Sequence, residues 1–329
     1  MKILISDYPD SMMPTHDYEM EILKNGFPDC EIVIYEYHDE KREEFLEIIE
    51  DVDAILTGFI KIDEEAMDKA KKLKIISMNA TGYDNIDLKA ANKRGIGVCP
   101  VGEYCTIDVA EFTIGMIFSL VKQVKILTKD VEQNFKWRYD VAGANPRIEN
   151  LTLGIFGLGK IGRTVAKKAS LLGMKVLAYD PYVNKDLVNN NEVELVEDMN
   201  YLLSHSDVIS NHMNYNKTND KFFNLNIFKQ MSKIPFFINM GRGNSVEEDD
   251  LVRALDVGYL KGAALDVLKD ETPHLENHPL IGRDNVIVTP HAAFYTINSI
   301  KDLQKISTEN IVFYLKGDKD KVFKLVSDY

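Results

Sequence analysis

Short apolar runs alternate with amphipathic stretches along the whole chain. In the first third, the apolar runs occupy residues 3–6, 31–35, 54–57, 75–78 and 97–99. After residue 150 the alternation starts again, with runs at 153–156, 176–179, 208–211, 236–239, 263–267 and 286–289. Apolar strands that alternate with helices are typical of parallel sheets covered by helices on both faces. We therefore predict an α/β fold of two doubly wound parallel-sheet (Rossmann-like) domains with a cleft between them.

A glycine-rich turn lies in the middle of the chain. Gly157-Leu158-Gly159-Lys160-Ile161-Gly162 follows an apolar run and opens a helical pattern, and Asp180 ends the next apolar run, 18 residues beyond Gly162. This order of strand, glycine turn, helix, strand and acid is typical of a dinucleotide site, whereas the glycine pattern alone also fits an ordinary turn. The N–H groups at the start of the helix can bind phosphates.

The acid at the end of the second strand indicates which dinucleotide is bound. The Asp180 carboxylate can accept hydrogen bonds from a ribose 2′-hydroxyl, and its charge repels a 2′-phosphate. We therefore predict NAD as the cofactor. The residues predicted to bind it in this segment are Gly157, Gly159, Lys160, Ile161, Gly162 and Asp180.

Length and composition restrict the class of protein. A chain of 329 residues suggests two domains, and a net charge of −13 argues against a nucleic-acid partner. The N-terminus lacks the pattern of a signal peptide, and the longest apolar run, 112–121, is about half of the roughly 20 residues that a membrane span needs. The spacings of Cys30, Cys99 and Cys105 suggest neither disulfides nor a zinc site. We predict a cytoplasmic protein with a small-molecule substrate and no nucleic-acid or membrane partner.

Two helical stretches bear on the domain organisation. Residues 106–127 are apolar nearly all round, so we expect this helix to be buried at a domain junction or a subunit interface. The stretch 297–315 is too short to form a domain, and we expect it to pack on the first unit, which makes that unit discontinuous. Only the second unit contains the glycine pattern, so only that unit is expected to bind the dinucleotide.

Residues suited to acid–base and carboxylate chemistry follow the later strands. Arg242 comes after the run 236–239, Glu271 after the run 263–267, and His291 after the last run. The carboxyl ends of parallel strands line the ligand crevice. A guanidinium matches both oxygens of a carboxylate, and an imidazole can exchange a proton near neutral pH. Each residue also suits an ordinary structural role: a surface arginine, a solvated acidic loop or a buried histidine.

Three other histidines are candidate ligands. His212 follows the run 208–211, so we expect it in the cofactor crevice. His274 and His278 have the spacing of a helical metal pair, but Pro273 and Pro279 disfavour a helix there. No metal site is predicted.

Taken together, these segments resemble the D-2-hydroxyacid dehydrogenase family over essentially the whole chain. The segments that carry the resemblance are Ala80-Thr81-Gly82-Tyr83-Asp84-Asn85-Ile86-Asp87, Val109-Ala110-Glu111, 157–162, Tyr179-Asp180-Pro181-Tyr182, 239–243, Gly262-Ala263-Ala264-Leu265-Asp266-Val267 and Thr289-Pro290-His291. The run 291–296 is most similar to the D-lactate dehydrogenase branch. Residues 80–83 instead resemble the glycerate and hydroxypyruvate reductases.

The resemblance implies an activity and roles for particular residues. The activity is the reversible reduction of a 2-oxo acid to the (R)-2-hydroxy acid by hydride transfer, with NAD as cofactor. His291 would be the proton donor and acceptor with Glu271 as its partner, and Arg242 would bind the substrate carboxylate and carbonyl. Thr81 and Gly82 are expected to offer backbone N–H groups to that carboxylate. The family pattern also implies that Asp266 contacts the nicotinamide carboxamide.

The resemblance also implies how the chain is divided. A discontinuous, flavodoxin-like substrate-binding domain would comprise residues 1–102 plus 298–329, and the NAD-binding Rossmann domain would comprise 103–297. Members of the family are usually homodimers, so we expect a homodimer.

The substrate side chain is the least specified part of the prediction. The resemblance makes Phe59, Ile60, Tyr104 and Tyr295 candidates to face it, although each also suits a hydrophobic core. They favour pyruvate or a branched 2-oxo acid, whereas Lys61 leaves a polar substrate such as hydroxypyruvate open.

Two other functions fit parts of the pattern. A formate-type hydride donor has the same architecture but pairs the histidine with glutamine, so Glu271 argues against it. An NAD(H)-sensing, corepressor-like binding protein on the same fold can retain all three residues, because fold does not determine function. Oxidation of NADH with 2-oxo acids distinguishes it from an enzyme.

Overall fold

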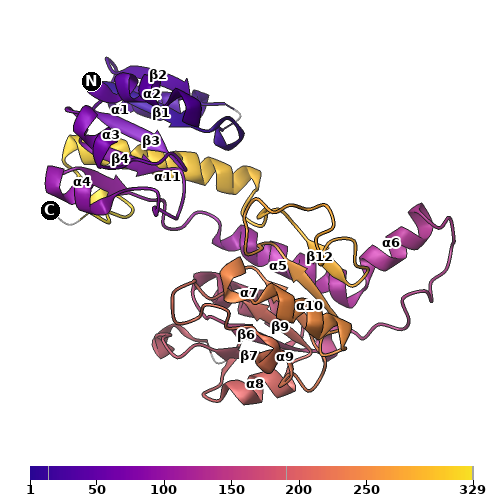
Figure 1. Cartoon of the computed structure of the whole chain (residues 1–329). Coiled ribbons are helices and arrows are strands. Elements are labelled where there is room, and N and C mark those ends of the chain that lie inside the picture. Colours follow the sequence, from indigo (N-terminus) through magenta and orange to yellow (C-terminus); the bar gives the residue numbers. More distant parts are fainter. Residues whose placement is uncertain (14, 190, 328–329) are drawn as a thin grey trace. The chain divides into compact units, whose positions relative to one another are not determined.

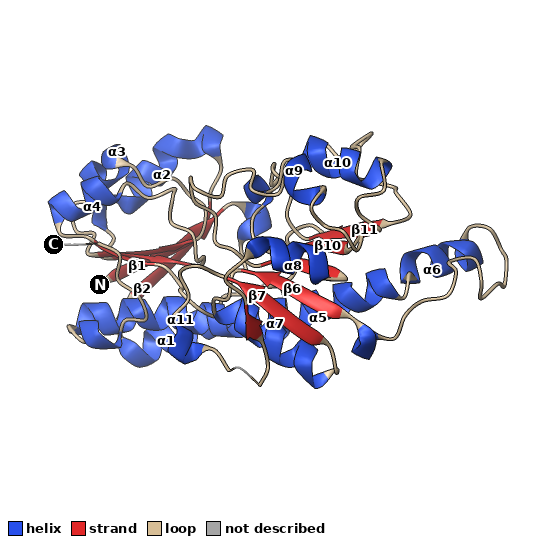
Figure 2. Ribbon diagram, turned by 90° about the horizontal axis from the view of Figure 1, so that it is seen from below, coloured by secondary structure: helices blue, strands red, loops and turns tan. Residues whose placement is uncertain are grey.

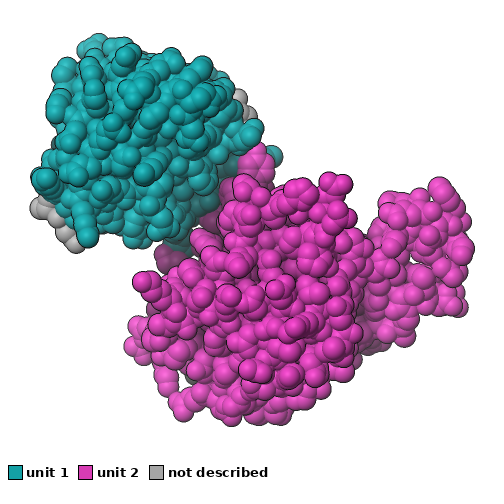
Figure 3. All heavy atoms as spheres, viewed as in Figure 1, with its two compact units in different colours: residues 1–104, 296–329 teal, residues 105–295 magenta. Residues whose placement is uncertain are grey.

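The structure is a computed structural model that describes residues 1–13, 15–189 and 191–327. The chain divides into two compact units, one of Met1–Tyr104 with Thr296–Tyr329 and the other of Cys105–Tyr295 (Figure 3). These limits lie two residues from the domain limits expected from sequence.

The first unit is built on a five-stranded parallel sheet with the strand order β2-β1-β3-β4-β5 (Figure 1). The strands are β1 (Lys2–Asp7), β2 (Glu31–Glu36), β3 (Ala54–Thr57), β4 (Ile75–Met78) and β5 (Gly97–Cys99). The helices are α1 (Asp17–Gly26), α2 (Arg42–Ile48), α3 (Glu64–Lys69), α4 (Leu88–Arg94) and α11 (Ile297–Lys316). Figure 2 shows helices on both sides of this sheet.

Alternate strand residues of the first unit pack on opposite helical layers. Leu4 and Ile55 face α2, α3 and α4, whereas Ile3 and Leu56 face α1 and α11. Burial on both faces explains why these strands are continuous apolar runs in the sequence. The prediction that the C-terminal helix packs on the first unit is confirmed, because α11 contacts α1 and β4.

The second unit contains a seven-stranded parallel sheet with the order β12-β11-β10-β9-β6-β7-β8. Its strands are β6 (Thr152–Phe156), β7 (Lys175–Tyr179), β8 (Glu194–Leu195), β9 (Val208–Asn211), β10 (Phe236–Asn239), β11 (Gly262–Leu265) and β12 (Val286–Val288). Its helices are α5 (Thr106–Val121), α6 (Val124–Glu132), α7 (Lys160–Leu171), α8 (Met199–His205), α9 (Leu225–Phe228) and α10 (Glu248–Asp256). α5 and α7 cover one face, and α8, α9 and α10 cover the other. The chain direction across the sheet reverses at β6, which is where a doubly wound sheet binds its ligand.

The apolar stretch 106–127 is two helices rather than the single one expected. Gln123 has a left-handed backbone with φ of +52°, which ends the first helix and starts α6 in a new direction. One face of α5 is buried against α7, but Ile107 and Phe118 are exposed in the single chain. No helix among the described residues is long and apolar enough to span a membrane.

Candidate active site

The glycine turn joins β6 to α7 and leaves room for a ligand backbone. Gly157 has φ of +86°, a left-handed conformation that glycine adopts without strain. A Cβ on Gly162 would lie 2.1 Å from the Gly157 carbonyl oxygen, so helix and turn approach as closely as glycine permits. A Cβ on Gly159, the N-cap residue of α7, would meet nothing within 4 Å. The N–H groups at the start of α7 fit the pyrophosphate of a dinucleotide.

Asp180 holds this turn through two backbone hydrogen bonds. Its Oδ2 accepts a hydrogen bond of 2.8 Å from the Leu158 N–H, and its Oδ1 accepts one of 2.9 Å from the Tyr182 N–H. A carboxylate has about four lone-pair positions, so two remain for sugar hydroxyl groups. The residues present therefore fit NAD.

His212 lies beside the glycine turn and is held in its neutral form. A Cβ on Gly157 would lie 2.9 Å from the His212 carbonyl oxygen. The His212 Nε2 is 2.8 Å from the Ser210 Oγ, while the buried Nδ1 has no hydrogen-bond partner within the described residues. Burial lowers the pKa of His212 to about 4. A neutral imidazole beside the turn adds no charge to the cofactor phosphates.

A buried network that sequence reasoning missed supports the Arg242 segment. Asn211 ends β9 and Asn239 ends β10, and the Asn211 Nδ2 donates to the Asn239 Oδ1 (2.9 Å) and the Ser245 Oγ (2.9 Å). The Asn239 Nδ2 and the Ser245 hydroxyl both donate to the Arg242 carbonyl oxygen, at 3.1 and 2.6 Å. The feature of the sequence that indicates this network is the Asn at the end of each of two adjacent apolar strands.

Arg242 itself is exposed at the carboxyl edge of the sheet. One guanidinium N–H donates to the Gly241 carbonyl oxygen at 3.0 Å. Because the network fixes its backbone while the side chain faces solvent, the guanidinium is available for a carboxylate.

His291 and Glu271 form a pair near this edge. The His291 Nδ1 lies 2.9 Å from the Glu271 Oε2, and both side chains remain accessible to solvent. His291 has φ of +51°, which a residue with a Cβ adopts only at a cost of about 1–2 kcal/mol. The structure therefore brings together two of the three residues expected to be catalytic, with the histidine in a strained conformation.

Asp266 explains how that conformation is held. Its side chain is 2% exposed. Its Oδ1 accepts from the Thr289 hydroxyl (2.6 Å) and the Ala292 N–H (2.9 Å), and its Oδ2 accepts from the Ala293 N–H (2.9 Å). The His291 N–H also donates to the Asp266 carbonyl oxygen at 2.7 Å. Asp266 thus supports the His291 turn, a role that sequence reasoning did not assign. Its contact with the nicotinamide stays a prediction.

The residues expected to contact substrate differ in exposure. Thr81, Gly82, Phe59 and Tyr295 are exposed, and Tyr104 is half-buried. Ile60 is fully buried in the core of the first unit, so its side chain does not suit the expected role. The sequence does not show which of Phe59 and Ile60 faces the core, because the two residues are adjacent and both are apolar.

His274 and His278 do not lie on one face of a helix. The His274 Nδ1 lies 3.2 Å from the Glu276 carbonyl oxygen, and the segment is not helical. Among the described residues, no group of three or more His, Cys, Asp and Glu side chains could hold a metal ion.

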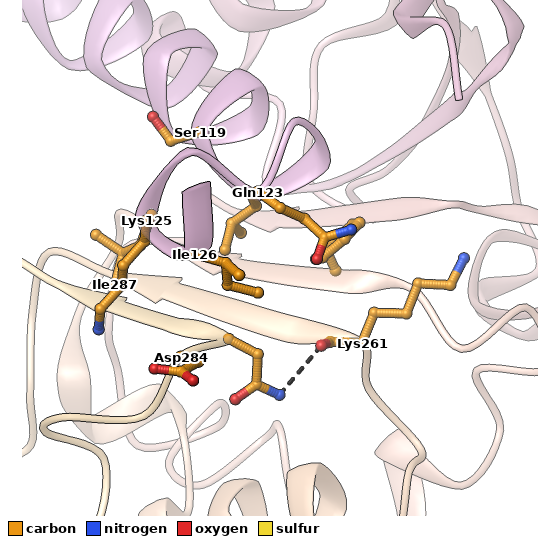
Figure 4. Close-up of a pocket in the computed structure, with 10 residues that line it drawn as sticks. Ser119, Gln123, Lys125, Ile126, Lys261, Asp284 and Ile287 are labelled. Atoms are coloured by element: carbon orange, nitrogen blue, oxygen red, sulfur yellow. Dashed lines mark hydrogen bonds between the residues drawn. The ribbon is translucent and has the colours of Figure 1, made fainter. Parts of the chain in front are cut away.

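A cavity of about 230 Å³ in the second unit lies away from all these residues (Figure 4). Its lining includes Gln123 between α5 and α6, Lys125 in α6, and Lys261 and Asn285 just before β11 and β12. These are the amino ends of the strands, whereas the predicted site residues of this unit follow the carboxyl ends. The cavity is therefore not part of the candidate active site.

The second unit therefore has the parts of an NAD-dependent dehydrogenase: a dinucleotide turn, an exposed arginine and a histidine–carboxylate pair at one edge of the sheet. Comparison with known proteins supports this class. The family model described as "D-isomer specific 2-hydroxyacid dehydrogenase, NAD binding domain" matches residues 114–293.

Individual relatives agree with the family match. A glyoxylate reductase from Thermofilum pendens is 36% identical over 296 residues, which are 88% of this chain and 86% of that protein. A D-3-phosphoglycerate dehydrogenase from Methanocaldococcus jannaschii is 32% identical over 97% of this chain but only 58% of its own length. The crystal structure of D-lactate dehydrogenase from Aquifex aeolicus, complexed with NAD and lactic acid, has a TM-score of 0.81 at 29% identity, with 99% of each chain covered.

The chain belongs to the family of D-isomer specific 2-hydroxyacid dehydrogenases. It is an NAD-dependent oxidoreductase of that family. The alternative of a corepressor-like binding protein receives no support from these comparisons.

Proposed function

We propose that this enzyme reduces a 2-oxo acid with a small or apolar side chain to the (R)-2-hydroxy acid, with His291, Glu271 and Arg242 as its catalytic residues. The observation that carries the proposal is the 2.9 Å contact between the His291 imidazole and the Glu271 carboxylate, near the carboxyl edge of the NAD-binding sheet.

His291 supplies the proton that reduction requires. When bound, NADH supplies a hydride to the C2 carbon of the substrate, and negative charge develops on the carbonyl oxygen. With its Nδ1 bonded to Glu271, the imidazole presents Nε2 on the opposite side of the ring, from which a proton passes to that oxygen. Glu271 orients the ring and fixes which nitrogen faces the substrate.

Arg242 orients the substrate. Its exposed guanidinium offers paired donors to the carboxylate and one N–H to the carbonyl oxygen as charge develops there. In the first unit, the exposed backbone at Thr81 and Gly82 offers N–H donors to the same carboxylate, and Phe59 is proposed to contact the side chain.

The exposed apolar side chains favour a particular range of substrates. Phe59 and Tyr295 suit pyruvate or a branched 2-oxo acid, whereas the exposed Lys61 suits hydroxypyruvate. A glyoxylate reductase among the relatives adds the smallest 2-oxo acid to this range.

The test is oxidation of NADH with glyoxylate, pyruvate, hydroxypyruvate and 4-methyl-2-oxopentanoate, followed by analysis of product configuration. We expect turnover with at least one of them, and an (R) product wherever the new carbon is a stereocentre. NADH binding without turnover of any 2-oxo acid would instead favour the corepressor-like function.

We also propose that the enzyme is a homodimer, because a segment of the second unit presents aromatic residues to solvent. α6 and the chain after it project from the rest of that unit (Figures 1 and 2). The buried Asp130 carboxylate accepts from the Arg138 Nη2 (2.7 Å) and Nε (3.0 Å), which fixes the turn between them. Phe135, Trp137 and Tyr139 lie in or just after this turn and are 87%, 91% and 95% exposed. Exposed aromatic residues on a fixed segment are typical of a protein interface.

Trp137 is the sole tryptophan of the chain, so its fluorescence reports on this segment. We expect a dimer by sedimentation with blue-shifted emission that moves to the red on dilution. Trp137→Ala should weaken the dimer, whereas Tyr182→Ala, which removes another exposed aromatic side chain of the same unit, should not. A monomer with fully solvent-exposed Trp137 would contradict the proposal. The location of the enzyme in the cytoplasm is likewise a proposal that rests on the sequence.

A further inference from the structure

Asp7 is a buried carboxyl group at the carboxyl end of β1. Its side chain is 4% exposed. The Asp7 Oδ2 accepts from the Gly58 N–H (2.6 Å), and its Oδ1 accepts from the N–H groups of Phe59 (3.2 Å) and Tyr8 (3.0 Å). Burial raises the pKa of Asp7 to about 6, although these backbone bonds oppose the rise. At neutral pH the protein therefore keeps a charged group in a place that disfavours charge.

The loop that Asp7 holds is also held from its other side. The Asn85 Nδ2 donates to the carbonyl oxygens of Gly58 (3.2 Å) and Ile60 (2.8 Å). The Arg42 guanidinium donates to the Lys61 carbonyl oxygen at 2.8 Å. The backbone of residues 58–61 is thus bound through both its N–H and its carbonyl groups.

This fixed backbone carries an exposed aromatic side chain. Ile60 is buried and anchors the loop in the core, but Phe59 is 58% exposed. Exposing a phenylalanine gains no stability, and neither does ionising a buried acid. A loop that exposes a phenylalanine, is held by a buried acid and is fixed at several other points is arranged for contact with a ligand.

We propose that Asp7 is a positioning residue that fixes Phe59 against the substrate side chain and so sets the selectivity among 2-oxo acids. The inference rests on the proposed function. The buried Asp7 carboxylate acts through the Gly58 and Phe59 N–H groups that donate to it. Asn85 supports the same loop, and it also lies in the segment that carries Thr81 and Gly82.

Asp7→Asn tests this role, because an amide of equal size can accept hydrogen bonds on one side only. The probes are glyoxylate, which has no side chain, and 4-methyl-2-oxopentanoate, which has a large apolar one. We expect KM for the larger acid to rise about five- to tenfold, the effect of one lost hydrogen bond, with kcat and the glyoxylate KM nearly unchanged. Phe59→Ala should cause the same selective loss, and adding Asp7→Asn to it should have no further effect.

The matched control is Asp53→Asn. Asp53 also accepts from a backbone N–H, that of Lys2 (2.9 Å), but just before β3, at the amino edge of the same sheet. This control should leave both KM values unchanged. If Asp7→Asn does not fold, Asn85→Ala releases the carbonyl side of the loop and should give the same selective loss.

The outcomes separate this proposal from the proposed function. A wild-type enzyme that oxidises NADH with neither acid nor any other 2-oxo acid overturns both. Turnover by the wild type, with unchanged or equally raised KM values in the folded Asp7 variant, overturns the role of Asp7 alone. If Asn85→Ala is measured instead, unchanged or equally raised KM values in that variant also overturn the role of Asp7.

Discussion

Replacing Asp266 with alanine should disable proton transfer more than cofactor binding. The carboxylate accepts three hydrogen bonds, two of them from the backbone of the turn at Ala292, which is partly buried, and Ala293, which is buried. His291 within this turn has φ of +51°. Without the carboxylate, two backbone N–H groups lose their acceptor and the strained conformation loses its support.

The expected size follows from these contacts. Each unsatisfied buried N–H costs about 1–3 kcal/mol, and the left-handed conformation adds about 1–2 kcal/mol. The turn therefore loses at least about 3 kcal/mol relative to a relaxed arrangement, and 1.4 kcal/mol corresponds to a factor of ten. When it relaxes, the imidazole leaves Glu271, so we expect kcat to fall at least about 100-fold.

The assay combines steady-state NADH oxidation with NADH affinity measured by fluorescence. Thr289→Val is the intermediate case, because it removes only the hydroxyl that donates to Asp266 at 2.6 Å. We expect it to lower kcat about tenfold, the effect of one bond to a charged group. If Asp266→Ala kept kcat within about threefold (under 1 kcal/mol) while NADH affinity collapsed, Asp266 would act on the cofactor rather than on His291.

Further predictions concern pH and the cofactor turn. The pKa of Asp7 is raised from 3.8 to about 6 in the folded protein. Between these two pH values the folded state binds a proton that the unfolded state has lost, so the free energy of unfolding falls as pH rises. Asp7→Asn should therefore gain about 3 kcal/mol relative to wild type between pH 4 and 7 in urea unfolding. The lowered pKa of His212, about 4 against 6.5, has the opposite sign, so stability is lost as pH falls below about 6.5, and His212→Gln should remove that loss. Gly162→Val should weaken NADH binding at least about tenfold, because any side chain collides with the Gly157 carbonyl oxygen 2.1 Å away; calorimetric affinity equal to wild type would contradict this.

Much of the fold could be predicted from the sequence because buried parallel strands leave a direct signal. The apolar runs at 208–211 and 236–239 coincide with β9 and β10, which are buried between neighbours on both sides. β8 had no such signal, because Glu194 and Leu195 pair only with β7 at the edge of the sheet and are not buried. The break at Gln123 was also hidden, since a left-handed residue other than glycine leaves no compositional mark.

The site was predictable where a residue's chemistry shows in its type and position. His291, Glu271 and Arg242 follow strand ends, and strand ends are visible in the sequence. The supporting residues were not, because Asp7 and Asp266 bind backbone groups, and Asn211 binds side chains, that only the fold brings near them. Which of Phe59 and Ile60 faces solvent depends on the loop conformation that Asp7 holds.

The measurement that tests the central claim most directly is single-turnover reduction of a 2-oxo acid by His291→Asn with NADH already bound. If the imidazole provides the proton, the rate should fall about 100- to 10,000-fold while NADH affinity stays close to that of wild type. A variant that reduced the substrate at nearly the wild-type rate would show that the proton comes from elsewhere, and the His291–Glu271 pair would then have no part in catalysis.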